Sequence, residues 1–124
     1  MDIRVSSFGF KHGVPMEADL VLDVRFLPNP YYVPELKEHD GTEGPVRDYV
    51  MNAPESHEML QKLEELLAFS IPLYQREGKS QLVVAVGCTG GRHRSVAIAC
   101  QLAAYLRSLG YRVELSHRDK DNRR

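Results

Sequence analysis

Tryptophan is absent from this sequence and cysteine is scarce, and both facts limit what the chain can be. Two cysteines, Cys88 and Cys100, are too few for the disulfide framework of a small secreted domain. No run of about 18 apolar residues occurs, and the N-terminus lacks the basic stretch and apolar core of a secretory signal. Membrane-spanning and secreted classes are therefore disfavoured, and we expect a cytoplasmic chain with reduced thiols.

The composition is that of one ordinary globular domain, with 124 residues of which 43% are hydrophobic and 27% charged. The net charge of −1 hides an asymmetry along the chain. Residues 1–70 carry 6 Lys/Arg and 13 Asp/Glu, a balance of −7, whereas residues 71–124 carry 10 and 4, a balance of +6. We therefore expect an acidic ligand to bind in the C-terminal half, without a general attraction to nucleic acid.

Hydrophobic patterning predicts strands that alternate with helices. The predicted strands cover residues 3–10, 20–26, 82–86 and 112–115. The predicted helices cover residues 54–77, where Pro72 should cause a kink or an early end, and residues 95–109, closed by Gly110. Residues 82–86 are apolar at every position, which is typical of a central strand covered on both faces. The pattern predicts an α/β fold, a single Rossmann-like domain with a mainly parallel sheet of about four strands and flanking helices.

Two segments fit this pattern less simply. Residues 27–50 contain four prolines and two glycines, so we expect a long surface loop, which in a compact domain is functional or disordered. The connection between the first two predicted strands is only about nine residues long. That length is short for a crossover between parallel neighbours.

The segment Gly87–Ser95, with the sequence GCTGGRHRS, has the features of an anion-binding loop. It follows the most apolar strand and opens a helix, whose first N–H groups are unpaired and carry partial positive charge. Its glycines let the backbone approach a ligand closely, and Arg92 and Arg94 can grip a phosphate with their guanidinium groups. Ser95 can cap the helix or bind an oxygen. An exposed glycine-rich turn is the simpler alternative.

Other polar residues follow the first two predicted strands and can reach the same edge of the sheet. Asp23 can bind a sugar hydroxyl or amine, or orient Arg94, with Arg25 beside it. A structural salt bridge between Asp23 and Arg25 explains the pair equally well. His12 is a further candidate, although a surface histidine is the more common case.

The loop also contains C-x-x-G-x-x-R-S, which resembles the phosphate loop of cysteine-dependent phosphatases. In such an enzyme, Cys88 would attack phosphorus as a thiolate and Arg94 would hold the equatorial oxygens. Gly87 stands where those enzymes usually carry histidine. No aspartate lies in a recognisable general-acid loop, with Asp40 and Asp48 as the nearest options. Phosphatase activity is therefore the second hypothesis.

A longer resemblance carries more weight. The segments Asp23–Pro30, Gly87–Val96 and His117–Asp119 resemble the C-terminal domain of the RapZ (YvcJ) family, over nearly the whole chain. In enterobacterial members that domain binds small regulatory RNA, senses glucosamine-6-phosphate and presents the RNA to an endoribonuclease. The resemblance implies a regulator without enzymatic activity, in which Cys88 is a packed residue, no metal or cofactor is needed and homo-oligomers can form. The ligand site that we predict consists of Thr89, Gly90, Gly91, Arg92, His93, Arg94, Ser95, Asp23, Arg25 and His12.

The sequence departs from this family in three places. It contains no G-x-x-x-x-G-K-[ST], so the P-loop half of the family is missing and the chain is either an excised domain or a free-standing relative. Tyr31 occupies a position that is histidine in enterobacterial members. We expect residues 1–115 to form the domain and residues 116–124 a basic, flexible tail that two acids interrupt. The candidate RNA contacts in that tail are Arg118, Lys120, Arg123 and Arg124, with Lys79 and Arg107 outside it.

Overall fold

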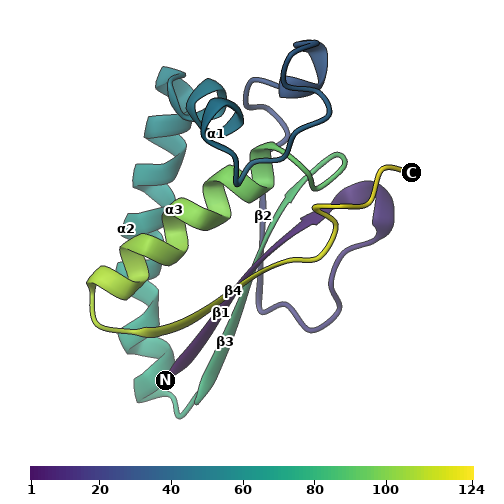
Figure 1. Cartoon of the computed structure of the whole chain (residues 1–124). Coiled ribbons are helices and arrows are strands. Elements are labelled where there is room, and N and C mark those ends of the chain that lie inside the picture. The colour runs from purple at the N-terminus through teal and green to yellow at the C-terminus, as the bar shows by residue number, and fades with distance from the viewer.

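The computed structural model describes all of residues 1–124, and four strands form a single sheet (Figure 1). The strands are β1 (Asp2–Gly9), β2 (Leu20–Asp23), β3 (Gln81–Cys88) and β4 (Arg112–His117). The α-helices are α1 (Gly44–Met51), α2 (Pro54–Arg76) and α3 (Arg94–Ser108), and two short 3₁₀ helices are η1 (Phe10–His12) and η2 (Pro30–Tyr32).

The sheet has the order β2-β3-β1-β4, and each neighbouring pair is parallel. This arrangement confirms the predicted α/β fold with a parallel four-stranded sheet. The central position of β3 explains its composition, since every residue from Leu82 to Cys88 is buried. β1 and β2 are not neighbours, because β3 lies between them. The short connection that links them therefore does not join adjacent strands.

All three α-helices lie on one face of the sheet (Figure 1). The crossovers from β2 to β3 and from β3 to β4 step in the same direction across the sheet, and right-handed crossovers then place their helices on the same side. The segment after η1 leads into β2 at the edge of the sheet, beside β3. Asp19 fixes the start of β2 against β3, since its N–H donates to the carbonyl of Val83 and its carboxylate accepts the N–H of Val83 at 2.8 Å.

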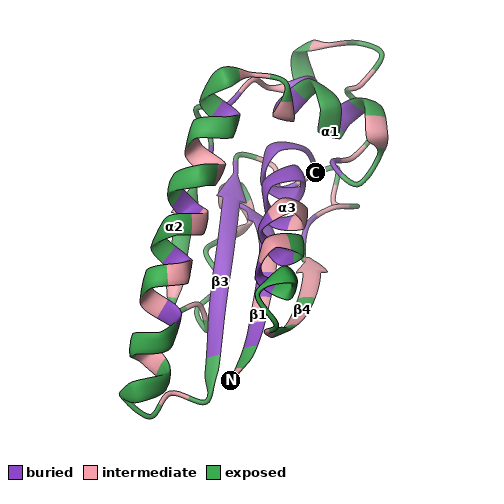
Figure 2. Ribbon diagram, turned by 90° about the vertical axis from the view of Figure 1, so that its left-hand side faces the viewer, coloured by how far each residue is buried: buried purple, intermediate pink, exposed green.

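The main core lies between the sheet and the helices (Figure 2). α3 contributes Leu102 and Leu106, and α2 contributes Leu67 and Ile71, all completely buried. Each such side chain stabilises the fold by roughly 1.5–3 kcal/mol relative to an exposed one. None of the helices is long and apolar enough to cross a membrane.

The prediction for residues 20–50 was wrong in two respects. The strand ends at Asp23 rather than Phe26, because the chain turns after Val24, where the N–H of Leu27 donates to the carbonyl of Val24 at 3.2 Å. The expected surface loop contains α1, whose Val46 and Val50 are buried. Its Pro45 was interpreted as a helix breaker, yet proline is well tolerated in the first turn of a helix.

Two further boundaries differ from the prediction. α2 continues past Pro72 to Arg76. Pro72 is exposed, so water can satisfy the carbonyl that loses its partner, while Ile71 and Tyr74 keep the helix packed on the core. β4 extends to His117 instead of ending at Leu115, because His117 pairs in register with Ser7 of β1. The expected domain boundary at residue 115 therefore falls inside a strand.

Candidate anion-binding site

The segment Gly87–Ser95 joins β3 to α3 at the carboxyl edge of the sheet. Gly91 has a φ of 78°, a left-handed conformation that side-chain-bearing residues rarely adopt. A Cβ atom at Gly91 would also collide with the backbone of Gly9 at the end of β1. The glycine therefore allows the loop to pack directly against the neighbouring strand.

Hydrogen bonds from three separate parts of the chain hold the loop and its surroundings. The N–H of Lys11 donates to the carbonyl of Thr89 at 3.2 Å, and the N–H of Gly41 donates to the carbonyl of Arg92 at 2.8 Å. The buried carboxylate of Asp119 accepts the N–H of Gly9 at 2.8 Å. The loop is thus fixed by the end of β1, by the segment before α1 and by the C-terminal segment.

A cavity of about 510 Å³ opens over this loop. Its lining residues come from the loop, from η1, from the segments around η2 and before α1, and from the C-terminus. They are Lys11, Asn29, Tyr31, Tyr32, Lys37, Glu38, Cys88, Thr89, Gly90, Arg92, His93, Arg94, Asn122 and Arg123. Five of these residues are lysine or arginine and only one is acidic, so the cavity carries a strong positive charge.

Arg94 is the most buried cation of the cavity, at 5% exposure. Its Nη1 donates to the backbone carbonyls of Arg25 and Leu27, and its Nη2 lies 3.4 Å from Oγ1 of Thr89. Its Nε is buried and has no partner within the protein. The side chain therefore braces the segment after β2 while one of its donors remains unsatisfied.

His93 packs beside it and bonds to the segment before α1. Its Nε2 lies 3.0 Å from the carbonyl of Lys37, and because a carbonyl only accepts, Nε2 carries the proton. Burial lowers the pKa of His93, and the charges of Arg92 and Arg94 add to this effect against the opposing hydrogen bonds to backbone carbonyls. The ring is therefore neutral at physiological pH.

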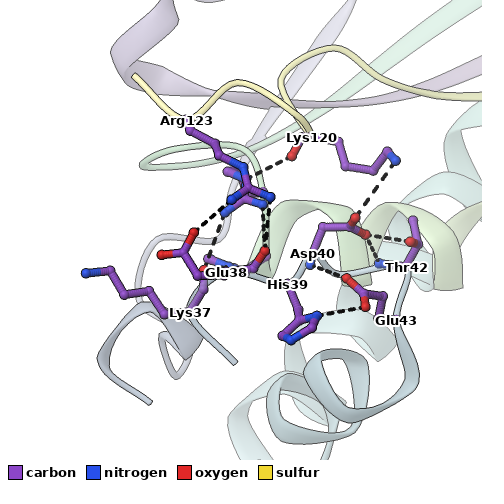
Figure 3. A network of polar contacts seen from close by, with 10 residues as sticks. Lys37, Glu38, His39, Asp40, Thr42, Glu43, Lys120 and Arg123 are labelled. Atoms are coloured by element: carbon purple, nitrogen blue, oxygen red, sulfur yellow. Dashed lines mark hydrogen bonds and ion pairs between the residues drawn. The ribbon is translucent and has the colours of Figure 1, made fainter. Parts of the chain in front are cut away.

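A network of polar contacts includes several residues of the cavity lining (Figure 3). Arg92 donates from Nε to the carbonyl of Lys120 at 2.9 Å and from Nη2 to the carbonyl of Glu38 at 3.2 Å. Arg123 donates from Nη1 to the carboxylate of Glu38 at 2.8 Å. Two arginines thus join the C-terminal segment to the turn before α1.

The structure places Asp23 and Arg25 outside the cavity lining. The two side chains pair with each other, with 2.7 Å between Nη2 of Arg25 and Oδ2 of Asp23, and Arg25 stacks over the ring of Phe10. The hydrogen bond from Arg25 is the main cause that lowers the pKa of Asp23. Asp23 and Arg25 therefore form the structural salt bridge that was the alternative explanation for this pair. Arg94 makes no hydrogen bond to Asp23.

Ser95, Gly91 and His12 also lie outside the cavity lining. The hydroxyl of Ser95 is fully buried and accepts a hydrogen bond from the thiol of Cys88 at 3.1 Å, and it does not cap α3. His12 contacts Asn122 at 3.3 Å. No group of three or more His, Cys, Asp or Glu side chains is arranged to hold a metal ion.

Three of the four candidate RNA contacts in the C-terminal segment are paired with acids. Arg118 pairs with Asp119 at 2.8 Å, Lys120 with Asp40 at 3.8 Å and Arg123 with Glu38 at 2.8 Å. Arg124 forms no ion pair. The C-terminal segment therefore contacts the rest of the domain through several side chains.

Sequence reasoning missed seven residues of the cavity lining, namely Lys11, Asn29, Tyr31, Tyr32, Lys37, Glu38 and Asn122. Lys11 follows β1, and the parallel order of β1 and β3 brings the ends of both strands to one edge. Once that order is known, Lys11 becomes a candidate. Lys37, Glu38 and Asn122 lie in irregular segments, where no local pattern in the sequence points to the cavity.

Comparison with known proteins gives a consistent result. The sequence model of the RapZ C-terminal domain matches residues 1–121. A nucleotide-binding protein of Alkaliphilus oremlandii is 60% identical over 119 residues, which is 96% of this chain and 41% of that protein. Nucleotide-binding proteins of Geobacter sulfurreducens and Clostridium acetobutylicum are 54% and 56% identical, over 98% and 94% of this chain and 42% and 40% of their own lengths. The chain thus spans about two fifths of these relatives, and it belongs to the RapZ C-terminal domain family.

Proposed function

We propose that this domain is a ligand-sensing regulatory module that binds a phosphorylated sugar in the cavity over the Gly87–Ser95 loop. The observation that carries the proposal is the lining of this cavity at the start of α3, with five lysines and arginines against one acid. The resemblance to RapZ proteins indicates glucosamine-6-phosphate as the first ligand to test. The volume of about 510 Å³ is within the range of small-molecule sites, roughly 300–1,000 Å³.

The phosphate end of the ligand is expected to bind at the loop. The N–H groups of Gly90 and His93 donate to no acceptor within the protein, and no acid occupies the first turn of α3. The N–H of His93 at the N-cap of α3, together with that of Gly90 in the loop before it, can donate to a bound anion. The unpaired Nε of Arg94 adds a donor nearby. These groups together match the several acceptor oxygens of a phosphate.

Lys11 and Lys37 are the lining cations that remain free to engage a ligand. Arg92, Arg94 and Arg123 already donate to backbone carbonyls or to Glu38, whereas no ion pair joins Lys11 or Lys37 to an acid. The ammonium of Lys37 lies 4.6 Å from the ring centre of Tyr31. Both lysines can therefore turn to a bound phosphate without breaking a salt bridge.

The remaining lining suits a polar, uncharged ring. Asn29, Asn122 and the two exposed tyrosines, Tyr31 and Tyr32, offer donors, acceptors and flat apolar faces. Glu38 is the single acid of the lining and already pairs with Arg123 at 2.8 Å, so the ammonium of an amino sugar would share its carboxylate with that arginine. The presence of polar and aromatic side chains beside the cations favours a phosphosugar over inorganic phosphate.

Titration calorimetry tests the proposal with glucosamine-6-phosphate, inorganic phosphate, glucosamine and, because the relatives are named as nucleotide-binding, a nucleoside triphosphate. Glucosamine-6-phosphate should bind more tightly than phosphate or glucosamine. Lys11→Ala and Lys37→Ala should each weaken binding about 10-fold or more, since a hydrogen bond to a charged group is worth roughly 1.5–3 kcal/mol. Lys62→Ala is the control, because Lys62 lies on α2 and does not line the cavity. Unchanged affinity in both cavity variants would refute the site.

RNA binding, which the resemblance also implies, would use Arg124 and the surrounding basic side chains. Because most of the basic C-terminal residues are already paired with acids, we expect few phosphate contacts and a shallow salt dependence, with a log–log slope of roughly 0.7–0.9 per contact. Gel-shift titrations with structured RNA at several salt concentrations measure that slope. Delivery of RNA to an endoribonuclease belongs to the same proposal and requires binding here first.

One contact favours phosphatase activity as the second candidate function. Cys88 and Arg94 both line the cavity, and the thiol of Cys88 bonds to Ser95, the residue that follows the arginine of the C-x-x-G-x-x-R-S motif. Asp40 and Asp48 are absent from the lining, which leaves Glu38 as the one acid there. Turnover of an aryl phosphate that disappears in Cys88→Ser would support this alternative, and no turnover would exclude it.

A further inference from the structure

The C-terminal residues form part of the wall of the cavity over the Gly87–Ser95 loop. Asn122 and Arg123 both line this cavity, together with Glu38 from the turn before α1. Figure 3 shows the side chain of Arg123 extending from the C-terminal segment toward Glu38. We call residues 122–124 the strap. It links two parts of the cavity wall that lie 85 positions apart in the sequence.

The chain just before the strap is held firmly. The carboxylate of Asp119 is only 7% exposed and accepts the N–H of Gly9 at 2.8 Å. The carbonyl of Lys120 accepts a hydrogen bond from Nε of Arg92 at 2.9 Å. Because these contacts do not involve the strap, the residues up to Lys120 can keep their place when the strap moves.

Weaker contacts hold the strap itself. The N–H of Asn122 donates to the carbonyl of Asp119 at 3.0 Å, and its side-chain amide lies 3.3 Å from Nδ1 of His12. Arg123 pairs with the carboxylate of Glu38 at 2.8 Å, between side chains that are 61% and 64% exposed. An exposed ion pair contributes little to stability, because water solvates both charges and salt screens them. Opening the strap therefore breaks only a turn and surface contacts.

The pair of Arg123 and Glu38 sets the charge of the cavity. With the strap closed, five cations and one acid give the lining a formal charge of +4. With Arg123 withdrawn, four cations and one acid leave +3, and the carboxylate of Glu38 loses its partner. Glu38 stays at the cavity in either case, because Nη2 of Arg92 donates to its carbonyl at 3.2 Å. An anion is therefore attracted less strongly when the strap is open.

We propose that the strap is a closing element of the cavity, in which Arg123 raises the affinity for an anion by neutralising Glu38. This inference rests on the proposed function, since it requires an anionic ligand in the cavity. A bound anion attracts Arg123 and repels an unpaired Glu38, so it stabilises the closed strap. By linkage, the closed strap stabilises the bound anion to the same extent.

Trimming of the free protein by carboxypeptidase B, which removes C-terminal arginine and lysine, tests the strap without any ligand. Mass spectrometry follows the loss of Arg123, which depends on how often the strap is open. Glu38→Gln should accelerate this loss roughly 1.5- to 5-fold, the effect of one exposed ion pair. Glu35→Gln is the matched control, since it removes the same charge from an exposed side chain outside the cavity lining. Its trimming rate should equal that of the wild type.

Titration calorimetry at low salt, with glucosamine-6-phosphate and inorganic phosphate as probes, tests the effect on affinity. Arg123→Gln should weaken both about 5-fold, the effect of one unit charge roughly 8 Å away at an intermediate dielectric constant. Glu38→Gln should strengthen phosphate binding by a similar factor. The double variant should bind phosphate like the wild type, because four cations and no acid again give +4. Arg76→Gln, at the end of α2, is the control for a lost arginine outside the cavity lining.

The two experiments separate a failure of the strap from a failure of the proposed function. A wild-type protein that binds neither probe would overturn the proposed function and the role of Arg123 in affinity together. Normal wild-type binding that Arg123→Gln leaves unchanged would overturn only the role of Arg123. Equal trimming rates in Glu38→Gln and Glu35→Gln would overturn the strap, whatever the calorimetry shows. Thermal unfolding of each variant shows whether it is folded.

Discussion

Asp119 is the residue whose removal should reveal how the C-terminal segment holds the site. Its carboxylate is only 7% exposed and accepts the buried N–H of Gly9 at 2.8 Å, directly beside the contact of Gly9 with Gly91. It also accepts from Arg118 at 2.8 Å. Asp119→Ala removes both interactions and leaves the N–H of Gly9 buried without a partner.

The structure gives the size of the effect. A hydrogen bond to a buried charged acceptor contributes roughly 1.5–3 kcal/mol, and the partly exposed Arg118 adds at most about 1 kcal/mol because solvent screens its pair. We therefore expect a loss of about 2–3 kcal/mol in the free energy of unfolding. For 124 residues the unfolding entropy is about 0.26 kcal/mol/K, so the Tm should fall by about 8–12 °C. Asp119→Asn keeps an acceptor oxygen and should lose less.

Thermal unfolding followed by circular dichroism, supported by urea titration, provides the measurement. Asp121→Ala is the matched control, since it removes the same charge two residues later from a side chain that is 87% exposed. Its Tm should stay within about 2 °C of the wild type, as expected for a surface substitution. A Tm for Asp119→Ala that matches this control would refute the reasoning.

The lowered pKa of Asp119 predicts that its contribution to stability depends on pH. Burial alone raises the pKa of Asp119, but the hydrogen bonds from Arg118 and Gly9 and the charges of Arg118 and His12 outweigh it, so the pKa lies below its ordinary value. A carboxyl with a lowered folded-state pKa stabilises the protein above its unfolded pKa, and this stability is lost as pH falls through the folded value. The Tm difference between wild type and Asp119→Ala should therefore shrink in acid. A constant difference would show that the charge is not responsible.

Two further predictions concern the loop and the histidines. Gly91→Ala should lower the free energy of unfolding by about 2–5 kcal/mol, because of left-handed backbone strain and the clash with Gly9. Gly78 has a φ of 102° with open space around it, so Gly78→Ala should lose only the contribution of the strain. Equal Tm losses in the two variants would contradict the close packing of the loop. Burial lowers the pKa of both His93 and His117, so stability should decrease as pH falls below about 6.5, where only the unfolded chain is protonated. Replacing both histidines with Gln should flatten this dependence in Tm measurements, and an unchanged slope would assign it to other groups.

The strand, loop and helix from Gln81 to Ser108 could be predicted from the sequence because their signals are local. An apolar run, clustered glycines and a helical repeat of small apolar residues each act over a few neighbouring positions. The positive charge of Gly87–Ser95 could be predicted for the same reason. α1 escaped prediction because its glycine and proline lie in the first turn, and only the burial of Val46 and Val50 stabilises so short a helix.

The composition of the site depended on tertiary structure instead. The sequence by itself placed Thr89, Gly90, His93 and Arg94 within one short glycine-rich segment between a strand and a helix. The order β2-β3-β1-β4 decided that Lys11 would join them, whereas the pairing of Asp23 with Arg25 is a local contact between residues two positions apart. The walls come from segments far apart in the chain, around η2, before α1 and at the C-terminus. Contacts between such distant segments are set by how the sheet is ordered and packed, and no local pattern in the sequence records that arrangement.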